Sequence, residues 1–306
     1  MRIRNIVVPL DGSRLAEAAI PYATRLAEDG DATLTLVHVL EQRPPASVHG
    51  ERHLANPAEA SLYLDALRTS LGCTALEIRT HVHENAVRDV ARSLSEHAIE
   101  FHADLIVMTT HGSGGMKRWV FGSIAQQVIA RSSCPVLFVP CDPAPRSVAP
   151  DVRHVVVPLD GDPSHEQAIP LACALANVFG SAVQLLTVVP TIADLGGSRS
   201  AVARMLPGTA TTELDLEAEA AVEYLKSVRA ARCDMLAPIG ANPDLVERGD
   251  PAKVITRLAE RTDRALVVMA THRKVGAAAF WAGSVAPRVA ADVQCPVALV
   301  SMTNGS

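Results

Sequence analysis

The sequence predicts an α/β fold of two tandem doubly wound domains, each a five-stranded parallel sheet flanked by helices. Three observations favour this fold. The chain has 306 residues, about the length of two average domains. Its second half repeats the first. Each half alternates short apolar runs with segments of helical period, which is typical of a parallel sheet covered by helices.

The internal repeat is visible in two blocks. The residues at 108–123 return at 269–284, at an offset of 161, and the pentapeptide VPLDG at 8–12 returns at 157–161, at an offset of 149. The second copy therefore carries 12 extra residues, which fall around residues 190–212. A fixed offset over so many positions indicates two related domains.

Each copy opens on a short, almost wholly apolar run, at residues 6–10 and 155–159, as expected for a strand buried on both faces. The five strands predicted for the first copy lie at residues 6–10, 34–40, 76–82, 105–109 and 135–140. The segments between them have apolar residues at helical spacing. They predict a helix that starts after Ser13, helices at residues 58–71 and 86–101, and a short helix from Ser123.

Local signals refine two of these elements. Ser13 is a good N-cap, and Gly30 can end the first helix. Pro21 predicts a kink or a late start within it. In the second copy, the insertion at 190–212 includes a helical pattern at 201–205, and we interpret it either as a lid over a site or, preferably, as a flexible insertion.

The two copies are joined by a proline-containing stretch at residues 141–150 without helical or strand period, as expected for a semi-extended linker. We therefore expect one domain at residues 1–142, a linker at 143–152 and a second domain at 153–306. The last strands of the two copies could pair edge to edge, which would make the single chain a pseudo-dimer.

Composition excludes several classes of protein. The chain is 48% hydrophobic and 20% charged, with a net charge of -5, which gives no general reason to expect nucleic acid as a partner. No apolar run reaches the length that spans a membrane. The six cysteines form no CxxC pair and no disulfide-dense pattern. With no signal-like apolar run after the first residues, we expect a protein of the reducing cytoplasm.

The VPLD ending of the first strand and the block at residues 108–136 resemble the universal stress protein family, over essentially both halves. In the ATP-binding branch of that family a loop consists of Gly, two residues, Gly, nine residues, Gly and then Ser or Thr. The first copy has Thr109, Gly112, Gly122 and Ser123 at these positions, so three of the four motif positions are kept.

The second copy keeps less of this loop. It has Ala270, Arg273, Gly283 and Ser284 at the four positions, so both early glycines are replaced. By contrast, the second copy keeps at residues 249–252 the residue types with which the family usually starts its third helix. At this place the first copy has residues 84–86, which differ from that pattern. The resemblance therefore implies nucleotide binding chiefly in the first copy.

The spacing of this loop has a physical reason. A loop that leaves a strand and enters a helix turns several backbone N–H groups toward one point, and the helix N-terminus adds partial positive charge there. Gly112 and Gly122 remove the Cβ atoms that would hold a phosphate away. Ser123 can cap its helix or turn its hydroxyl to a phosphate. For this family the crevice lies between the first and fourth strands, with Asp11 and Met108 on its two sides.

The resemblance implies a role for each residue of the site. The residues expected around the adenine and ribose are Pro9, Leu10, Asp11, Val39 and Met108. Those expected around the phosphates are Gly112, Gly122, Ser123 and Ile124. Thr109, where the family prefers glycine, would either crowd the ribose or donate its hydroxyl to it. A weaker second site would consist of Asp160, Val188, Met269, Gly283 and Ser284.

Several of these residues have a simpler interpretation. Asp11 and Asp160 each follow a buried strand, where a carboxylate often orders a turn or caps the next helix. His81 and His83 lie two apart on a predicted strand, a spacing that can hold a metal. Only His53 or Glu84 could complete such a ligand set nearby, so we favour no metal site.

Three functions remain. The leading one is a cytoplasmic stress-response regulatory protein that binds ATP, or ADP or AMP, with or without Mg²⁺, and uses the second copy chiefly as a partner. No catalytic triad, paired carboxylates or Walker loop supports more than slow ATP hydrolysis. The alternatives are an interaction scaffold with vestigial sites and protein partners, and an adenylate-transferring enzyme. Association of two chains into a homodimer is left open.

Overall fold

The structure is a computed structural model, which describes residues 1–44, 47–48, 51–72, 76–110, 122–140, 150–272 and 284–302. The chain forms two compact units. The first consists of Met1–Asp151, Thr271–Gly283 and Pro296–Ser306, and the second of Val152–Ala270 and Ser284–Cys295. Most of the predicted linker at residues 143–152 lies outside the described residues, so the domain boundaries remain a prediction.

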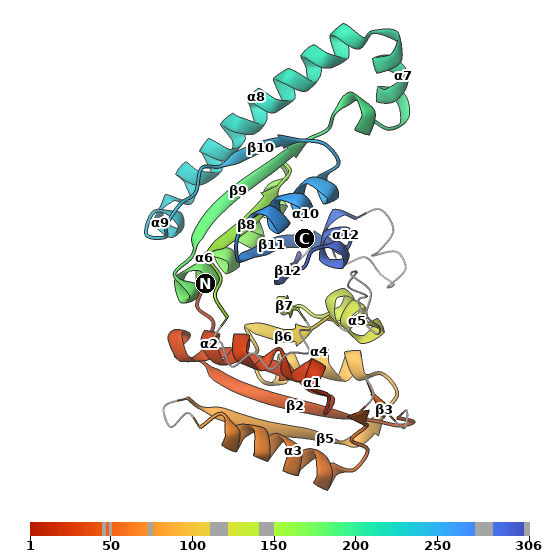
Figure 1. The fold of residues 1–306 in the computed structure, drawn as a ribbon, viewed down its shortest axis with the longest axis vertical. Helices are drawn as coiled ribbons and strands as arrows, with labels where there is room; N and C mark the ends of the chain where they lie inside the picture. Colours follow the sequence, from red (N-terminus) through yellow and green to blue (C-terminus); the bar gives the residue numbers. More distant parts are fainter. Residues whose placement is uncertain are drawn as a thin grey trace. The chain divides into compact units, whose positions relative to one another are not determined.

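The first unit contains a mostly parallel sheet, which confirms the predicted α/β fold (Figure 1). In order across the sheet, its strands are β12 (Val297–Met302), β7 (Val136–Val139), β6 (Leu105–Thr109), β1 (Asn5–Pro9), β2 (Thr33–Glu41) and β5 (Ile78–Val87). All neighbouring pairs among the five strands of the first half are parallel. Along the chain the strand order changes direction between β1 and β6, as predicted from the family resemblance.

The last strand of the second half belongs to this first unit. β12 pairs antiparallel with β7, with Ala298 opposite Leu137. The predicted pairing of the two final strands is therefore confirmed.

The helices of the first unit follow the apolar pattern of the sequence. They are α1 (Arg14–Glu17), α2 (Ile20–Gly30), α3 (Pro57–Ser70), α4 (Val90–Glu100) and α5 (Ser123–Arg131). Pro21 is at the start of α2, so the late helix start predicted from it is confirmed. A two-stranded hairpin of β3 (Ser47–Val48) and β4 (Glu51–Arg52) lies outside the main sheet.

The predicted helix at residues 86–101 is wrong at its start. β5 continues to Val87, which pairs with Glu41 of β2, and α4 begins only at Val90. Asp89 is the N-cap of α4, with its side chain accepting a hydrogen bond from the Arg92 N–H at 3.0 Å. Asp250 has the same role before α10, 161 residues later. Residues 88–91, and not 84–86, are therefore the counterpart of the helix start at 249–252.

We expect Asp89→Ala to lower the free energy of unfolding by about 1 kcal/mol, because the N-cap hydrogen bond is lost. Asp89→Asn keeps a good cap and removes the charge that pairs with Arg131. This hydrogen bond to Arg131 holds the pKa of Asp89 below its usual value. The wild type should therefore exceed the Asn variant in stability above about pH 4 and lose the difference as the pH falls through the folded-state pKa. Urea denaturation between pH 2.5 and pH 7 measures this; a gap that widens toward acid pH would contradict it.

The second unit has a parallel sheet of the same kind. In order, its strands are β10 (Leu245–Arg248), β9 (Ala182–Val189), β8 (His154–Leu159) and β11 (Ala265–His272). The helical elements that accompany it are η1 (Pro163–Ala168), α6 (Ile169–Phe179), η2 (Ile192–Asp194), α7 (Gly197–Met205), α8 (Pro207–Ala231), α9 (Cys233–Leu236), α10 (Pro251–Arg261) and α12 (Val285–Asp292).

The insertion of the second copy is helical. Its predicted helix at residues 201–205 is the second half of α7, and α8 follows after one residue. Figure 1 shows α8 running beside β10 and β9. Leu214 and Ala221 of α8 pack with Val189 of β9 in a buried cluster. The insertion thus extends the helical layer of the second unit.

The apolar runs are buried as the sequence predicted. Ile6, Val7 and Val8 of β1 are at most 1% exposed, and Val155 to Val157 of β8 are fully buried. Strands covered on both faces by helices require apolar side chains on both sides. Within the described part of the chain, every helix is too short or too polar to cross a bilayer.

Candidate functional site

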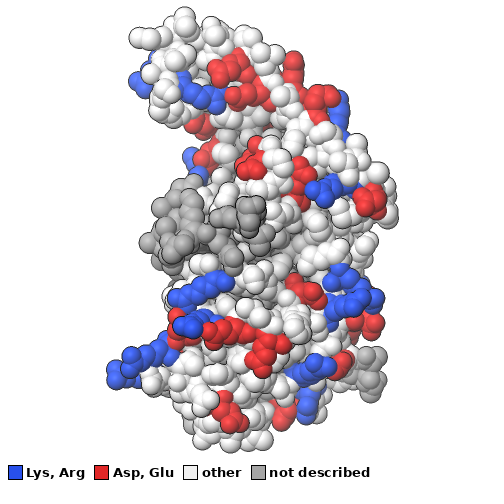
Figure 2. All heavy atoms as spheres, turned by 180° about the vertical axis from the view of Figure 1, so that it is seen from behind, with Lys and Arg blue, Asp and Glu red and all other residues white. Residues whose placement is uncertain are grey.

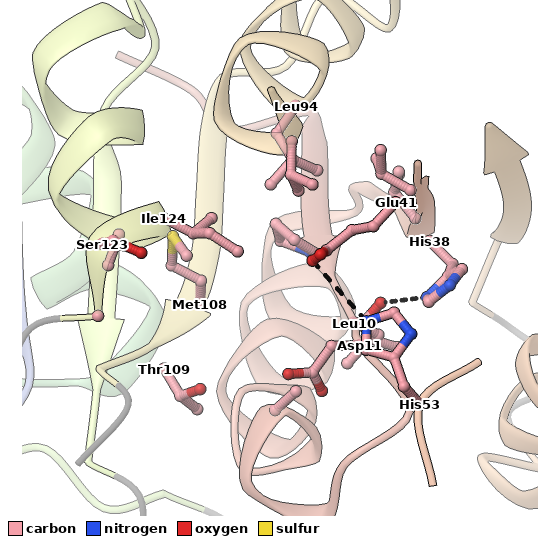
Figure 3. A pocket seen from close by; sticks show the side chains of 17 residues that line it. Leu10, Asp11, His38, Glu41, His53, Leu94, Met108, Thr109, Ser123 and Ile124 are labelled. Carbon is pink, nitrogen blue, oxygen red and sulfur yellow. Dashed lines mark hydrogen bonds and ion pairs between the residues drawn. The ribbon is translucent and has the colours of Figure 1, made fainter. Parts of the chain in front are cut away.

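A cavity of about 380 Å³ lies at the carboxyl ends of β1, β2 and β6 in the first unit (Figure 3). Residues from the ends of these strands, together with the first turns of α4 and α5, form its wall. Its volume falls within the range of roughly 300–1,000 Å³ that is usual for small-molecule sites. The open parallel sheet thus presents a cavity where the strand order changes direction, the usual place for a ligand in such folds.

Nine of the ten residues predicted for the first site line this one cavity. They are Pro9, Leu10, Asp11, Val39, Met108, Thr109, Gly122, Ser123 and Ile124. The tenth, Gly112, lies outside the described residues. Figure 3 shows Met108, Ser123 and Ile124 on one side of the cavity and Asp11 on the other.

The segment at the end of β1 forms one part of the cavity wall. The Leu10 N–H donates to the Val37 carbonyl at 2.8 Å, which continues the pairing of β1 with β2 beyond Pro9. Gly12 then turns the chain with φ of +88°, and a Cβ atom there would lie 2.8 Å from the Leu54 side chain. Glycine is therefore required at this turn on two grounds, conformation and space.

Asp11 orders this turn, as its simpler interpretation predicted. One of its carboxylate oxygens accepts hydrogen bonds from the Ser13 N–H at 2.9 Å and from the Ser13 hydroxyl at 2.6 Å. The Ser13 hydroxyl in turn accepts from the Ala16 N–H at 3.2 Å and caps α1. Because Asp11 also lines the cavity, its carboxylate is held at the cavity wall by the turn it orders.

The opposite end of the cavity is the start of α5. Gly122 is its N-cap and has no side chain with which to cap the helix. The first residues of α5, Ser123 and Ile124, line the cavity. Backbone N–H groups of a first helical turn have no partner within the helix, and the helix dipole favours negative charge beside them. An anionic group such as a phosphate fits this end of the cavity.

The middle of the cavity is apolar on most sides. Val39, Met108 and Leu94 lie in its wall, and Met108 and Val39 are almost fully buried. Thr109 also forms part of the wall and is 1% exposed. Thr109, which stands at the first glycine position of the motif, therefore does not fill the cavity. A flat aromatic ring system fits such a wall.

The cavity also contains polar residues that the motif did not predict. His38 of β2 has its Nδ1 2.7 Å from the Leu10 carbonyl and its Nε2 3.2 Å from the Leu54 carbonyl. The ring of His53 is buried, with Nε2 3.7 Å from the Glu41 carboxylate (Figure 3). Its Nδ1 has no hydrogen-bond partner among the described residues. A histidine inside the apolar run 34–40 was the one signal in the sequence that could have identified His38.

The topology of the second unit brings three residues of the weaker site together. Asp160 follows β8, Val188 lies in β9 and Met269 in β11, at the same end of neighbouring parallel strands. Ser284 is the N-cap of α12, and Gly283 lies outside the described residues. This arrangement matches that of the first unit in its order of elements.

In the second unit the aspartate is engaged by a histidine. His165 Nδ1 lies 2.6 Å from an oxygen of Asp160, and the Asp162 N–H donates to the same oxygen at 3.1 Å. Burial alone would raise the pKa of Asp160, but these hydrogen bonds hold it below its usual value. The hydrogen bond to Asp160 raises the pKa of His165. Asp160 therefore orders the turn before η1.

Comparison with known proteins agrees with this architecture. The model of the universal stress protein family matches residues 2–140 and 151–301. A universal stress protein of Methanocaldococcus jannaschii is 33% identical over 146 residues, which are 44% of this chain and 81% of that protein. A solved structure of a functionally unknown protein from Pseudomonas aeruginosa has a TM-score of 0.68 at 16% identity and covers 98% of this chain and 93% of its own. A universal stress protein structure from Archaeoglobus fulgidus has a TM-score of 0.65 at 13% identity, with 99% and 98% covered.

Proposed function

The chain belongs to the universal stress protein family, and from that premise we propose that its first half binds ATP, or the related nucleotides ADP or AMP, in the cavity beside β1 and β6. The protein would act as a cytoplasmic regulator in a stress response. The second half would serve chiefly as a partner for the first. Mg²⁺ would accompany the phosphates when the ligand is ATP.

The observation that supports this proposal is that nine of the ten predicted site residues line one cavity. Val39 and Met108 offer an apolar wall for adenine, and the start of α5 offers backbone N–H groups for the phosphates. Asp11 lies on the side of the cavity opposite Met108 and Ser123, and its carboxylate can accept hydrogen bonds from ribose hydroxyls. An adenine nucleotide would use all three features together.

The proposal is tested by identifying the ligand. The protein would be purified under native conditions, denatured with acid, and the released small molecules identified by mass spectrometry. Equilibrium titrations with ATP, ADP and AMP, each with and without Mg²⁺, would rank the nucleotides. We expect an adenine nucleotide in the released fraction and saturable binding at one site. Protein that is both empty and unable to bind any of the three would contradict the proposal.

A second candidate function is that of an interaction scaffold. It is favoured by apolar side chains on the helices of the insertion: Met205 is 83% exposed, Leu206 56% and Leu216 60%. Exposed apolar residues grouped on one pair of helices are typical of surfaces that contact another protein. This function is compatible with nucleotide binding, and it becomes the main proposal if the nucleotide titrations fail.

We propose no nucleic acid or membrane partner. On the face shown in Figure 2, basic and acidic side chains of the described residues lie interspersed. Proteins that bind nucleic acid usually gather Lys and Arg in one patch or stripe. The net charge of -5 also gives no general reason to expect a nucleic acid partner.

A further inference from the structure

Three histidines of the first unit lie close together, and none of them is part of the lining of the cavity described above. His81 and His83 are on β5 and are half-buried, and His97 is on α4 and is buried. Each offers one ring nitrogen, and these three nitrogens lie within 4.8 Å of one another. From the sequence, only His53 or Glu84 was a candidate for the third member of such a set; in the structure it is His97, from the helix that follows β5.

The orientation of His97 is fixed by a carboxylate. Its Nδ1 lies 2.9 Å from the Glu100 carboxylate. Because an ionised carboxylate only accepts hydrogen bonds, Nδ1 of His97 carries the ring proton and Nε2 presents a lone pair. This Nε2 lies 3.0 Å from His83 Nδ1, which then donates the proton between them. A histidine that donates to a carboxylate through one nitrogen and presents the other is the usual arrangement of a metal ligand.

His81 supplies an unsatisfied atom. Its Nε2 is buried and has no hydrogen-bond partner among the described residues. The His81 and His97 rings lie 4.6 Å apart, and Phe101 contacts both of them, stacking on His97 at 5.4 Å. These ring contacts hold the imidazoles in place, while leaving a buried polar nitrogen unsatisfied costs free energy.

We propose that His81, His83 and His97 form a binding site for one divalent transition-metal ion of the zinc class, with the remaining coordination position open to water. Imidazole ligands suit zinc, nickel, copper and iron, and three protein ligands with one open position are typical of zinc sites that are not purely structural. Tetrahedral zinc with Zn–N bonds of about 2.0–2.1 Å places the ligand nitrogens about 3.3 Å apart. In the structure the three nitrogens lie within 4.8 Å of one another, so binding of the ion would draw the three side chains closer together.

The surroundings of the cluster suit a cation. β5 is the last strand in the sheet order of this unit, so the half-buried His81 and His83 are close to solvent. The Glu100 carboxylate, 2.9 Å from His97 Nδ1, adds negative charge beside the cluster. To bind an ion through Nδ1, the neutral His83 ring would carry its proton on Nε2 in place of Nδ1, which breaks only its hydrogen bond to His97.

Titration with Co²⁺, whose visible absorption reports tetrahedral nitrogen ligands, tests the proposal on the full chain. We expect one Co²⁺ per chain, displaced by Zn²⁺. His83→Gln and His81→Gln should each weaken binding by about 100-fold or more, since a ligand is lost. His154→Gln is the matched control, because His154 is a half-buried histidine of the second unit that bonds to Asn242. Its affinity should equal that of the wild type.

Glu100→Gln separates a metal site from a merely structural histidine cluster. The Glu100 side chain is 61% exposed, so this variant should fold normally. Weakening the support of a ligating histidine typically reduces metal affinity by about 10- to 100-fold. If the histidine variants fail to fold, the wild-type protein can be acylated with and without zinc, and the modified histidines identified by peptide mass spectrometry. Zinc should then protect His83 from acylation and leave the acylation of His154 unchanged. No Co²⁺ binding by the wild type, or equal binding by the wild type, Glu100→Gln and the histidine variants, would overturn the proposal.

Discussion

Replacing Gly122 with leucine is expected to weaken ATP binding by about 100-fold or more, equivalent to about 3 kcal/mol of binding free energy. Gly122 lines the cavity at the start of α5, with φ of -59° and ψ of 152°. These angles are open to any residue, so the substitution places a side chain in the phosphate end of the cavity without straining the backbone. The added atoms would keep a phosphate from the N–H groups of α5.

The matched control is Gly283→Leu, at the equivalent position of the second copy. If the first half holds the nucleotide, this variant should bind ATP as the wild type does. Both proteins would be checked by circular dichroism and titrated with labelled ATP under identical conditions. Equal affinities for Gly122→Leu and the wild type would remove the site from the first half. A loss of ATP affinity confined to Gly283→Leu would place the nucleotide site in the second half.

Replacing Phe138 with alanine is expected to lower the free energy of unfolding of the first unit by about 3–5 kcal/mol. Phe138 is fully buried on β7, opposite Met108 of β6 and Val297 of β12. The substitution removes a large apolar side chain and leaves a cavity at β7. This strand is the final strand of the first half and pairs with β12, the final strand of the second half. We expect a lower urea midpoint for the first unit and loss of ATP binding at lower urea than in the wild type.

Leu62→Ala is the control for this loss. Leu62 lies on α3 and is 71% exposed, so its truncation should change stability by no more than about 0.5 kcal/mol. Following unfolding by two probes, circular dichroism and nucleotide binding, separates the first unit from the second, because a chain of two units need not unfold in one step. A Phe138 variant as stable as the Leu62 variant would contradict the position of β7 in the core.

The central strands and most of the residues that line the candidate cavity could be predicted from sequence because both follow local pattern. Strands buried on both faces are apolar throughout, as residues 6–8 show. The site residues follow directly after such strands or at the start of α5, and topology alone brings the carboxyl ends of parallel strands together. The family resemblance, carried by the spacing of the loop motif and the VPLD ending of the first strand, therefore implied nine residues that line one cavity.

The start of α4 could not be predicted in the same way. Residues 83–87 are polar or half-exposed because β5 is the last strand in the sheet order of its unit, and their pattern lacks the apolar run of a central strand. What keeps them extended is pairing with β2, which is a tertiary contact. Asp89 was the local signal for the helix start, as Asp250 is in the second copy.

The positions of His53 and His97 could not be predicted from sequence for the same reason. His53 reaches the cavity from the segment after the β3–β4 hairpin, which has no helical or strand period to place it. His97 has helical spacing with its neighbours, but its approach to His83 depends on how α4 packs beside β5. In both cases residues distant in sequence meet through packing, which a local pattern does not contain.

The central claim is that an adenine ring binds against Val39 of β2 and Met108 of β6 in the cavity of the first unit. Photolabelling with 8-azido-ATP, followed by peptide mass spectrometry, tests it most directly. We predict that the label attaches to residues 37–41 or 108–109 and that excess ATP prevents it. Labelling that ATP does not prevent, or that falls on the second half of the chain, would contradict the account.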